Sequence, residues 1–150
     1  MSNSPELELF VHWAEPLQES DLQWIESRLP AVRDEVLSRY PESGLADLSE
    51  LELSLVDDAT LAEIHGEFFN DPTVTDVITF PHGEILVSVE MAARCGGEYG
   101  KGVRGETFLY LIHGFLHLAG LDDRSEADAA RMAREQEEIW EKCSRWTADK

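Results

Sequence analysis

Two histidines, His113 and His117, stand four residues apart in an apolar stretch of the chain, FLYLIHGFLHLA. In a helix, this spacing brings both imidazoles to one face, with their Cβ atoms about 5–6 Å apart. Gly120 then turns the chain, and two carboxylates, Asp122 and Asp123, follow it. Two imidazoles and one carboxylate suit a catalytic zinc ion, because three protein ligands leave a fourth position for water. The spacing therefore predicts a zinc site at His113, His117 and Asp123.

A purely structural role for the same two histidines is the alternative. Imidazoles on an apolar helix can also be core residues that hydrogen-bond to backbone carbonyls. Peptidase chemistry of the H-E-x-x-H type is disfavoured, because Gly114 stands where those enzymes carry the glutamate that acts as general base. Gly114 instead leaves space over the helix for the close approach of a substrate or another strand.

The elements that position these residues follow from the spacing of the apolar side chains. Ser20 and Ser125 are typical N-caps, and Gly120 lies where a helix C-cap belongs. The last helix carries Gln136 on its inner stripe. The expected strands cover 7–13, 48–56, 76–80 and 84–89, and the expected helices cover 21–39, 58–69, 90–98, 104–119 and 126–143, with a loop over 41–47. This order predicts one α+β domain over residues 1–150, with a small mixed sheet covered by helices and the zinc site on a buried helix.

The composition favours a soluble cytoplasmic protein. The 150 residues are 43% hydrophobic, which suffices for one core. No apolar run reaches the roughly 18 residues of a membrane helix, and the N-terminus does not resemble a signal peptide. The two cysteines, Cys95 and Cys143, are expected to be reduced thiols, and no role is assigned to them.

The net charge of −19 is distributed unevenly. Residues 1–90 hold 20 carboxylates and three arginines, whereas residues 91–150 hold 11 carboxylates and nine basic residues. Taken whole, the chain repels nucleic acid, so contact with a polyanion is expected to use the C-terminal part. The basic side chains available there include Arg94, Lys101, Arg104, Arg124, Arg131 and Arg134.

The segment HGFLHLAGLDD (113–123) resembles the HGxLHLxGxDH signature of the YbeY family of bacterial metallo-endoribonucleases. A second segment, DPTVTDVITFPHGEILVSVEMA (71–92), is similar to the PTDVLSFP block of that family. The resemblance implies a zinc-dependent, single-strand-specific endoribonuclease that matures the 3′ end of small-subunit ribosomal RNA and acts in ribosome quality control. The implied partners are ribosomal RNA and ribosome-associated proteins, with neither DNA nor a membrane involved.

Carried over residue by residue, the resemblance implies that His113, His117 and Asp123 bind one zinc ion. The family usually has a third histidine where this chain has Asp123. A carboxylate is a legitimate zinc ligand, but its negative charge should weaken the metal as a Lewis acid and raise the pKa of its bound water. The family also commonly carries an arginine suited to a phosphate where this chain has Phe69.

Two further carboxylates are candidates for catalysis, and the proton acceptor is left open. Asp122 either orients an imidazole or closes the end of the helix. Asp76, at the start of the strand that leads to Phe80, either caps a turn or reaches the site. With no arginine at position 69, the candidates for RNA binding are Arg94, Arg104 and Arg124.

A different class of function is also compatible with these residues. The missing arginine and the net charge of −19 favour a ribosome-assembly or partner-binding protein in which zinc is mainly structural. This alternative keeps the three metal ligands but leaves little nuclease activity.

Overall fold

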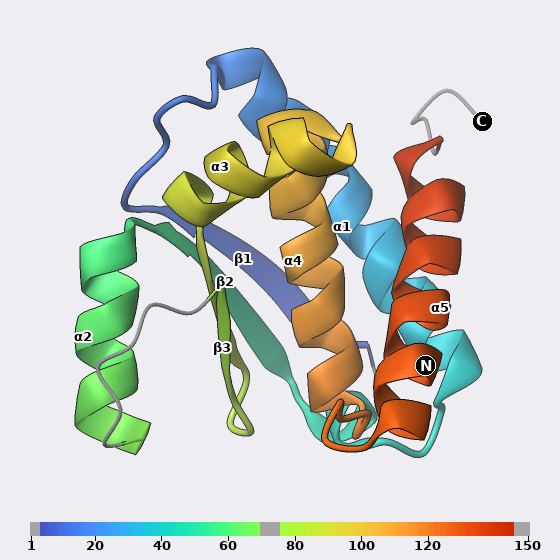
Figure 1. Ribbon diagram of the computed structural model, residues 1–150. Helices are drawn as coiled ribbons and strands as arrows, with labels where there is room; N and C mark the ends of the chain where they lie inside the picture. Colours follow the sequence, from blue (N-terminus) through green and yellow to red (C-terminus); the bar gives the residue numbers. More distant parts are fainter. Residues whose placement is uncertain (1–3, 70–75, 146–150) are drawn as a thin grey trace.

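The protein has a four-stranded mixed sheet with helices packed against it, as the computed structural model in Figure 1 shows. The structure describes residues 4–69 and 76–145. β1 and β2 run parallel, as do β2 and β4, and β3 pairs antiparallel with β4. The prediction of an α+β fold with a small mixed sheet is therefore confirmed. The strands, in the spatial order β1-β2-β4-β3, are β1 (Glu6–Val11), β2 (Glu50–Val56), β4 (Glu84–Ser88) and β3 (Val77–Phe80).

The five expected helices all occur within the described residues, with small shifts at their ends. The N-cap of the first helix is Gln18 and not Ser20, because the Asp21 carboxylate accepts the backbone N–H of Gln18 at 2.9 Å. Ser125 caps the last helix as predicted, since its hydroxyl accepts the N–H of Asp128. The helices are α1 (Glu19–Arg39), α2 (Asp58–Phe69), α3 (Val89–Tyr99), α4 (Gly102–Leu118) and α5 (Glu126–Ser144), and a short 3-10 helix, Gly44–Asp47, lies in the expected loop.

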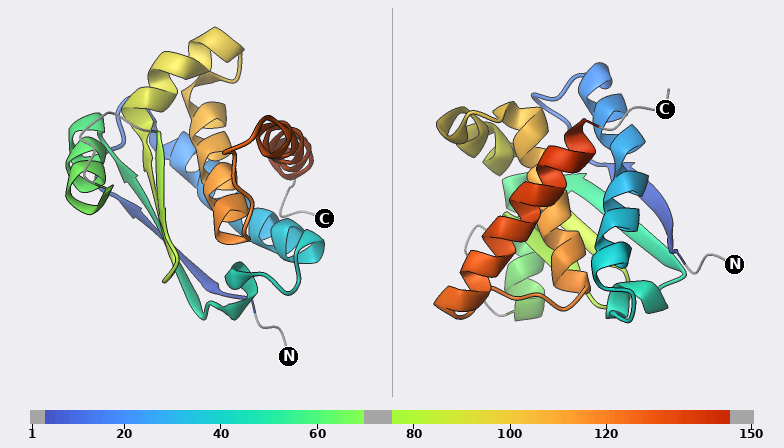
Figure 2. Two further views of the ribbon diagram at one scale, coloured as in Figure 1. Left: turned by 60° about the horizontal axis from the view of Figure 1, so that its bottom comes forward. Right: turned by 90° about the vertical axis from the view of Figure 1, so that its right-hand side faces the viewer.

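Helices cover both faces of the sheet (Figures 1 and 2). α1, α4 and α5 pack together on one face and enclose the larger apolar core, while α2 covers the other face over a smaller cluster. β4 contributes to both clusters, because Ile85 and Val87 belong to the larger one on the side of α4 and Leu86 belongs to the smaller one on the side of α2. In the part of the chain that the structure describes, no helix is both long and apolar enough to cross a membrane.

α4 lies at the centre of the helical layer and touches α1, α3, α5, β3 and β4. A Cβ atom added to Gly114 would lie 2.5 Å from Cγ2 of Ile85, so α4 approaches β4 more closely than a side chain would permit. The space that the sequence predicts over Gly114 is thus filled by a strand of the sheet. This close contact fixes the helix that carries both histidines.

Candidate metal centre

His113 and His117 lie on successive turns of α4, and their Nε2 atoms are 2.8 Å apart. The two rings stand nearly perpendicular, at 82°. Asp123, from the loop between α4 and α5, brings its Oδ2 to 3.9 Å from Nε2 of His113. One possible ligand atom from each of the three residues lies within 4.8 Å of the others, so the group could hold a metal ion.

The hydrogen bonds on the other side of each ring define the tautomers. Nδ1 of His113 lies 2.8 Å from Oε1 of Gln136, and Nδ1 of His117 lies 2.9 Å from the carbonyl oxygen of Leu121. Both partners are oxygen acceptors, so each Nδ1 donates its proton and each neutral ring presents a lone pair at Nε2. The two lone pairs therefore face each other at 2.8 Å beside a carboxylate.

Two lone pairs at this distance repel unless a cation lies with them. Protonation of the second ring nitrogen of His117 would relieve this repulsion but is disfavoured. The pKa of His117 is lowered by burial and, to a smaller extent, by the neighbouring His113. A divalent metal ion satisfies both imidazoles and the carboxylate at once. The donor set thus fits a zinc-like cation that leaves one coordination position for water or substrate.

The loop after α4 is held in place by backbone hydrogen bonds. The backbone N–H of Gly120, whose φ is +104°, donates to the backbone carbonyl of His117, and the N–H of Leu121 donates to the backbone carbonyl of Leu116. The reversal allows the Leu121 carbonyl to reach His117 and carries Asp123 back toward the imidazoles. Because Ser125 then caps α5, the loop is anchored at both ends.

Among the described residues, the oxygens that accept hydrogen bonds from the two imidazoles belong to other residues than Asp122, which was predicted either to orient an imidazole or to close the helix end. Oδ1 of Asp122 accepts the backbone N–H of Arg124 at 3.3 Å, which makes Asp122 a loop residue beyond the helix end. Gln136 and the Leu121 carbonyl orient the two rings instead. Sequence reasoning missed this role of Gln136, although a polar residue on an otherwise apolar inner stripe was the signal that could have revealed it.

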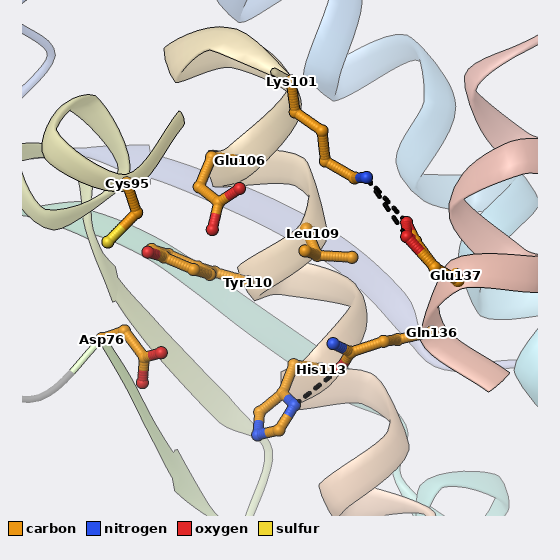
Figure 3. A pocket seen from close by; sticks show the side chains of 9 residues that line it. All are labelled: Asp76, Cys95, Lys101, Glu106, Leu109, Tyr110, His113, Gln136 and Glu137. Carbon is orange, nitrogen blue, oxygen red and sulfur yellow. Dashed lines mark hydrogen bonds and ion pairs between the residues drawn. The ribbon is translucent and has the colours of Figure 1, made fainter. Parts of the chain in front are cut away.

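A pocket of about 570 Å³ opens beside His113 (Figure 3). Asp76 lies at this pocket and so shares it with His113, whereas Asp122 lies at a different depression near Tyr40. The pocket is lined by Asp76, Cys95, Lys101, Glu106, Leu109, Tyr110, His113, Gln136 and Glu137.

The predicted RNA-binding arginines do not gather around this pocket. Arg94 forms an ion pair with Asp58 at 2.7 Å. Arg104 lies over the ring of Trp24, 4.4 Å from its centroid. Arg124 is the candidate that remains beside the metal centre, directly after Asp123 in the chain. The side chain of Phe69 and residues 70–75, which include the first part of the second motif, lie outside the described residues.

The fold and the site together define an α+β protein with an open site for one cation, the kind of site that metal-dependent hydrolases use. The family model described as Endoribonuclease YbeY matches residues 17–144. The chain belongs to the YbeY family of endoribonucleases, which are hydrolases that act as nucleases, and the resemblance carried by the two sequence motifs is confirmed.

Individual relatives agree with this assignment. The endoribonuclease YbeY of Protochlamydia amoebophila is 34% identical over 122 residues, which cover 74% of this chain and 79% of the relative. The endoribonuclease YbeY of Moorella thermoacetica is 31% identical over 141 residues, covering 81% and 90%. The solution structure of TM1509 from Thermotoga maritima has the same fold, with a TM-score of 0.53 and 22% identity over 94% of this chain and 97% of that chain.

Proposed function

We propose that this protein is a zinc-dependent endoribonuclease that cuts single-stranded RNA during ribosomal RNA processing. The observation that carries the proposal is the pair of Nε2 lone pairs of His113 and His117, turned toward each other beside Asp123. This ligand set lies within the motif of an endoribonuclease family. The resemblance further suggests the 3′ end of small-subunit ribosomal RNA as substrate, ribosome quality control as the setting, ribosome-associated proteins as partners and the cytoplasm as location.

In this mechanism, His113, His117 and Asp123 would hold the ion, which would supply a Lewis acid for a phosphodiester oxygen and lower the pKa of a water molecule. Gln136 and the Leu121 carbonyl keep each Nδ1 protonated, so that each Nε2 remains a ligand. Asp76 lies across the pocket from His113, and its carboxylate is the candidate to accept the proton of the attacking water. Arg124, next to Asp123, is the candidate to hold the phosphate of the substrate.

Incubation of the purified protein with a structured RNA that carries single-stranded ends tests this function. Zinc-loaded protein should cut the single-stranded ends, whereas metal-stripped protein and the double variant His113→Ala, His117→Ala should not. Cleavage at equal rates by all three preparations would show that this site is not the nuclease centre.

A ribosome-assembly or partner-binding protein with a mainly structural zinc is the second candidate. It is favoured by the pairing of basic side chains with carboxylates, since Lys101 in the pocket is paired with Glu137 at 2.7 Å and Arg94 is paired with Asp58. Removal of the metal separates the two functions. A large loss of thermal stability, together with no RNA cleavage at any metal load, would favour the binding protein.

A further inference from the structure

The pocket beside His113 contains a buried carboxyl group that neither the metal site nor the fold explains. Glu106, on α4 two turns before His113, is only 4% exposed, and its Oε1 has no hydrogen-bond partner among the described residues. Burial raises the pKa of Glu106, and the hydrogen bond with Tyr110 offsets part of that rise. Buried acceptors without a partner are rare, so this oxygen indicates a donor that a ligand would bring.

The charges around the pocket indicate what that ligand is not. Asp76, Glu106 and Glu137 contribute three carboxyl groups, and the one cation among the lining residues, Lys101, is already paired with Glu137. A phosphate group in this pocket would be repelled by the net negative charge. The phosphate of a substrate therefore belongs at the metal and Arg124, outside the pocket.

The size and the lining of the pocket fit a neutral group that carries N–H donors. A volume of about 570 Å³ lies in the range that small-molecule sites occupy. Tyr110 and Leu109 supply apolar surface, and the carboxyl group of Glu106 turns toward the space between Cys95 and Tyr110 (Figure 3). In single-stranded RNA, the neutral group next to each phosphate is a nucleobase, which proteins recognise by its faces and its hydrogen-bonding edge.

We propose that this pocket binds the nucleobase next to the phosphodiester that is cut, and that Glu106 accepts a hydrogen bond from the exocyclic amine of that base. The inference rests on the proposed function and adds a preference to it. Adenine and cytosine carry an exocyclic amine at the position where uracil and guanine present a carbonyl oxygen. The single N–H donor on the hydrogen-bonding edge of uracil, N3–H, lies between two carbonyl oxygens that the carboxyl oxygens of Glu106 repel, so the pocket favours cytosine and adenine over uracil.

The base preference is measured with single-stranded oligouridines that contain one adenosine or cytidine. The zinc-loaded protein should cut next to the amine-bearing nucleotide with a kcat/KM on the order of tenfold above that of the all-uridine strand. Glu106→Gln provides an amide that donates to O4 of uracil and accepts from its N3–H, so the ratio should fall toward one. Glu137→Gln removes a carboxylate of the same pocket and should keep the ratio. Equal cleavage of all strands by the unchanged protein would overturn the proposal.

A binding measurement separates this inference from the nuclease function. Cys95 lines the pocket, so its alkylation in metal-stripped protein reports occupancy without cleavage. Cytidine should slow the alkylation, uridine at the same concentration should not, and Glu106→Gln should abolish the difference. Protection by cytidine without RNA cleavage by any preparation would support the base site and contradict the nuclease function. RNA cleavage together with equal protection by both nucleosides would contradict the base site and support the nuclease function. If Glu106→Gln does not fold, the comparison of the two nucleosides on the unchanged protein still tests whether the pocket prefers an amine-bearing base.

Discussion

Nδ1 of His113 and Oε1 of Gln136 lie 2.8 Å apart, which joins the first imidazole of the metal centre on α4 to a side chain on α5. α5 supplies none of the three candidate ligands, yet it determines which nitrogen of His113 faces His117 and Asp123. The loop from Gly120 to Ser125 does the same for His117, through the carbonyl of Leu121. The geometry of the centre therefore depends on how α5 packs against α4.

Replacement of Gln136 by leucine should weaken zinc binding about 10–100-fold, because the His113 ring loses the acceptor that fixes its tautomer. Gln136→Glu retains an acceptor for Nδ1–H and should keep the affinity. Competition with a chromogenic chelator measures the affinity, and Arg134→Leu, an exposed position on the same helix, is the matched control. Unchanged zinc affinity in Gln136→Leu would show that the hydrogen bond does not support the ligand.

Asp123→Ala should lower the zinc content of the purified protein, because two imidazoles alone do not make the usual three-ligand site. Asp123→His should restore zinc binding and increase the rate of RNA cleavage at neutral pH, since a neutral ligand leaves the ion a stronger Lewis acid. Elemental analysis and cleavage rates measure the two effects. Full zinc occupancy with tight affinity in Asp123→Ala would remove Asp123 from the ligand set.

Gly114→Ala should destabilise the protein by about 1–3 kcal/mol, because the added Cβ would overlap Ile85 of β4. Gly97→Ala in α3 is the control, since no atom lies within 4 Å of a Cβ at that position. There, alanine should stabilise the helix by roughly 0.5–1 kcal/mol. Urea denaturation of the two variants measures the difference, and equal stabilities would contradict the close contact between α4 and β4.

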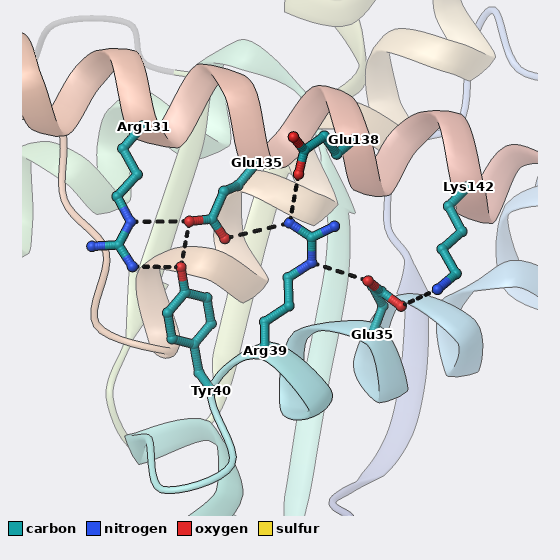
Figure 4. A network of polar contacts seen from close by, with 7 residues as sticks. All are labelled: Glu35, Arg39, Tyr40, Arg131, Glu135, Glu138 and Lys142. Carbon is teal, nitrogen blue, oxygen red and sulfur yellow. Dashed lines mark hydrogen bonds and ion pairs between the residues drawn. The ribbon is translucent and has the colours of Figure 1, made fainter.

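The free energy of unfolding should fall as the pH drops below about 4.5, partly because of Glu135 on α5. Burial by itself raises the pKa of Glu135, but hydrogen bonds with Tyr40 and Arg131 and the nearby arginine charges outweigh it, so the pKa is lowered (Figure 4). Because the pKa of Glu135 is lower in the folded state than in the unfolded state, its ionised form stabilises the fold. This stabilisation is complete above the unfolded-state pKa and is lost as the pH falls through the folded-state pKa.

Glu135→Gln should therefore lose about 1–3 kcal/mol of stability at pH 7 and show a shallower decline in acid. Glu138→Gln is the control, because that carboxylate also contacts Arg39 but is half exposed, at 52%. Thermal and urea denaturation between pH 3 and 7 supply the comparison. Parallel acid profiles for Glu135→Gln and the unchanged protein would exclude Glu135 as the titrating group.

Local patterns in the sequence determined most elements and the possible ligand set. Apolar spacing identified α4 and α5, β-branched runs identified the β3–β4 hairpin, and a spacing of four residues placed His113 and His117 on one face of a helix. These features depend on contacts within a few residues, which is why a linear pattern carries them. The start of α1 at Glu19, two residues before the predicted start at Asp21, escaped prediction because the Gln18–Asp21 hydrogen bond replaces the expected serine cap.

Only the tertiary structure decided which side chains surround the two histidines. Gln136 is 23 residues from His113, and Glu106 and Asp76 reach the same pocket from α4 and from the residue before β3. The same packing draws Arg94 to Asp58 and Arg104 to Trp24, so neither of these candidates for RNA binding lines the pocket beside His113. The sequence by itself thus determined the residue types that can bind a metal ion, because their spacing is local. Their tautomers, their neighbours and the charge of the pocket depend on how α3, α4, α5 and the sheet pack, which no local spacing encodes.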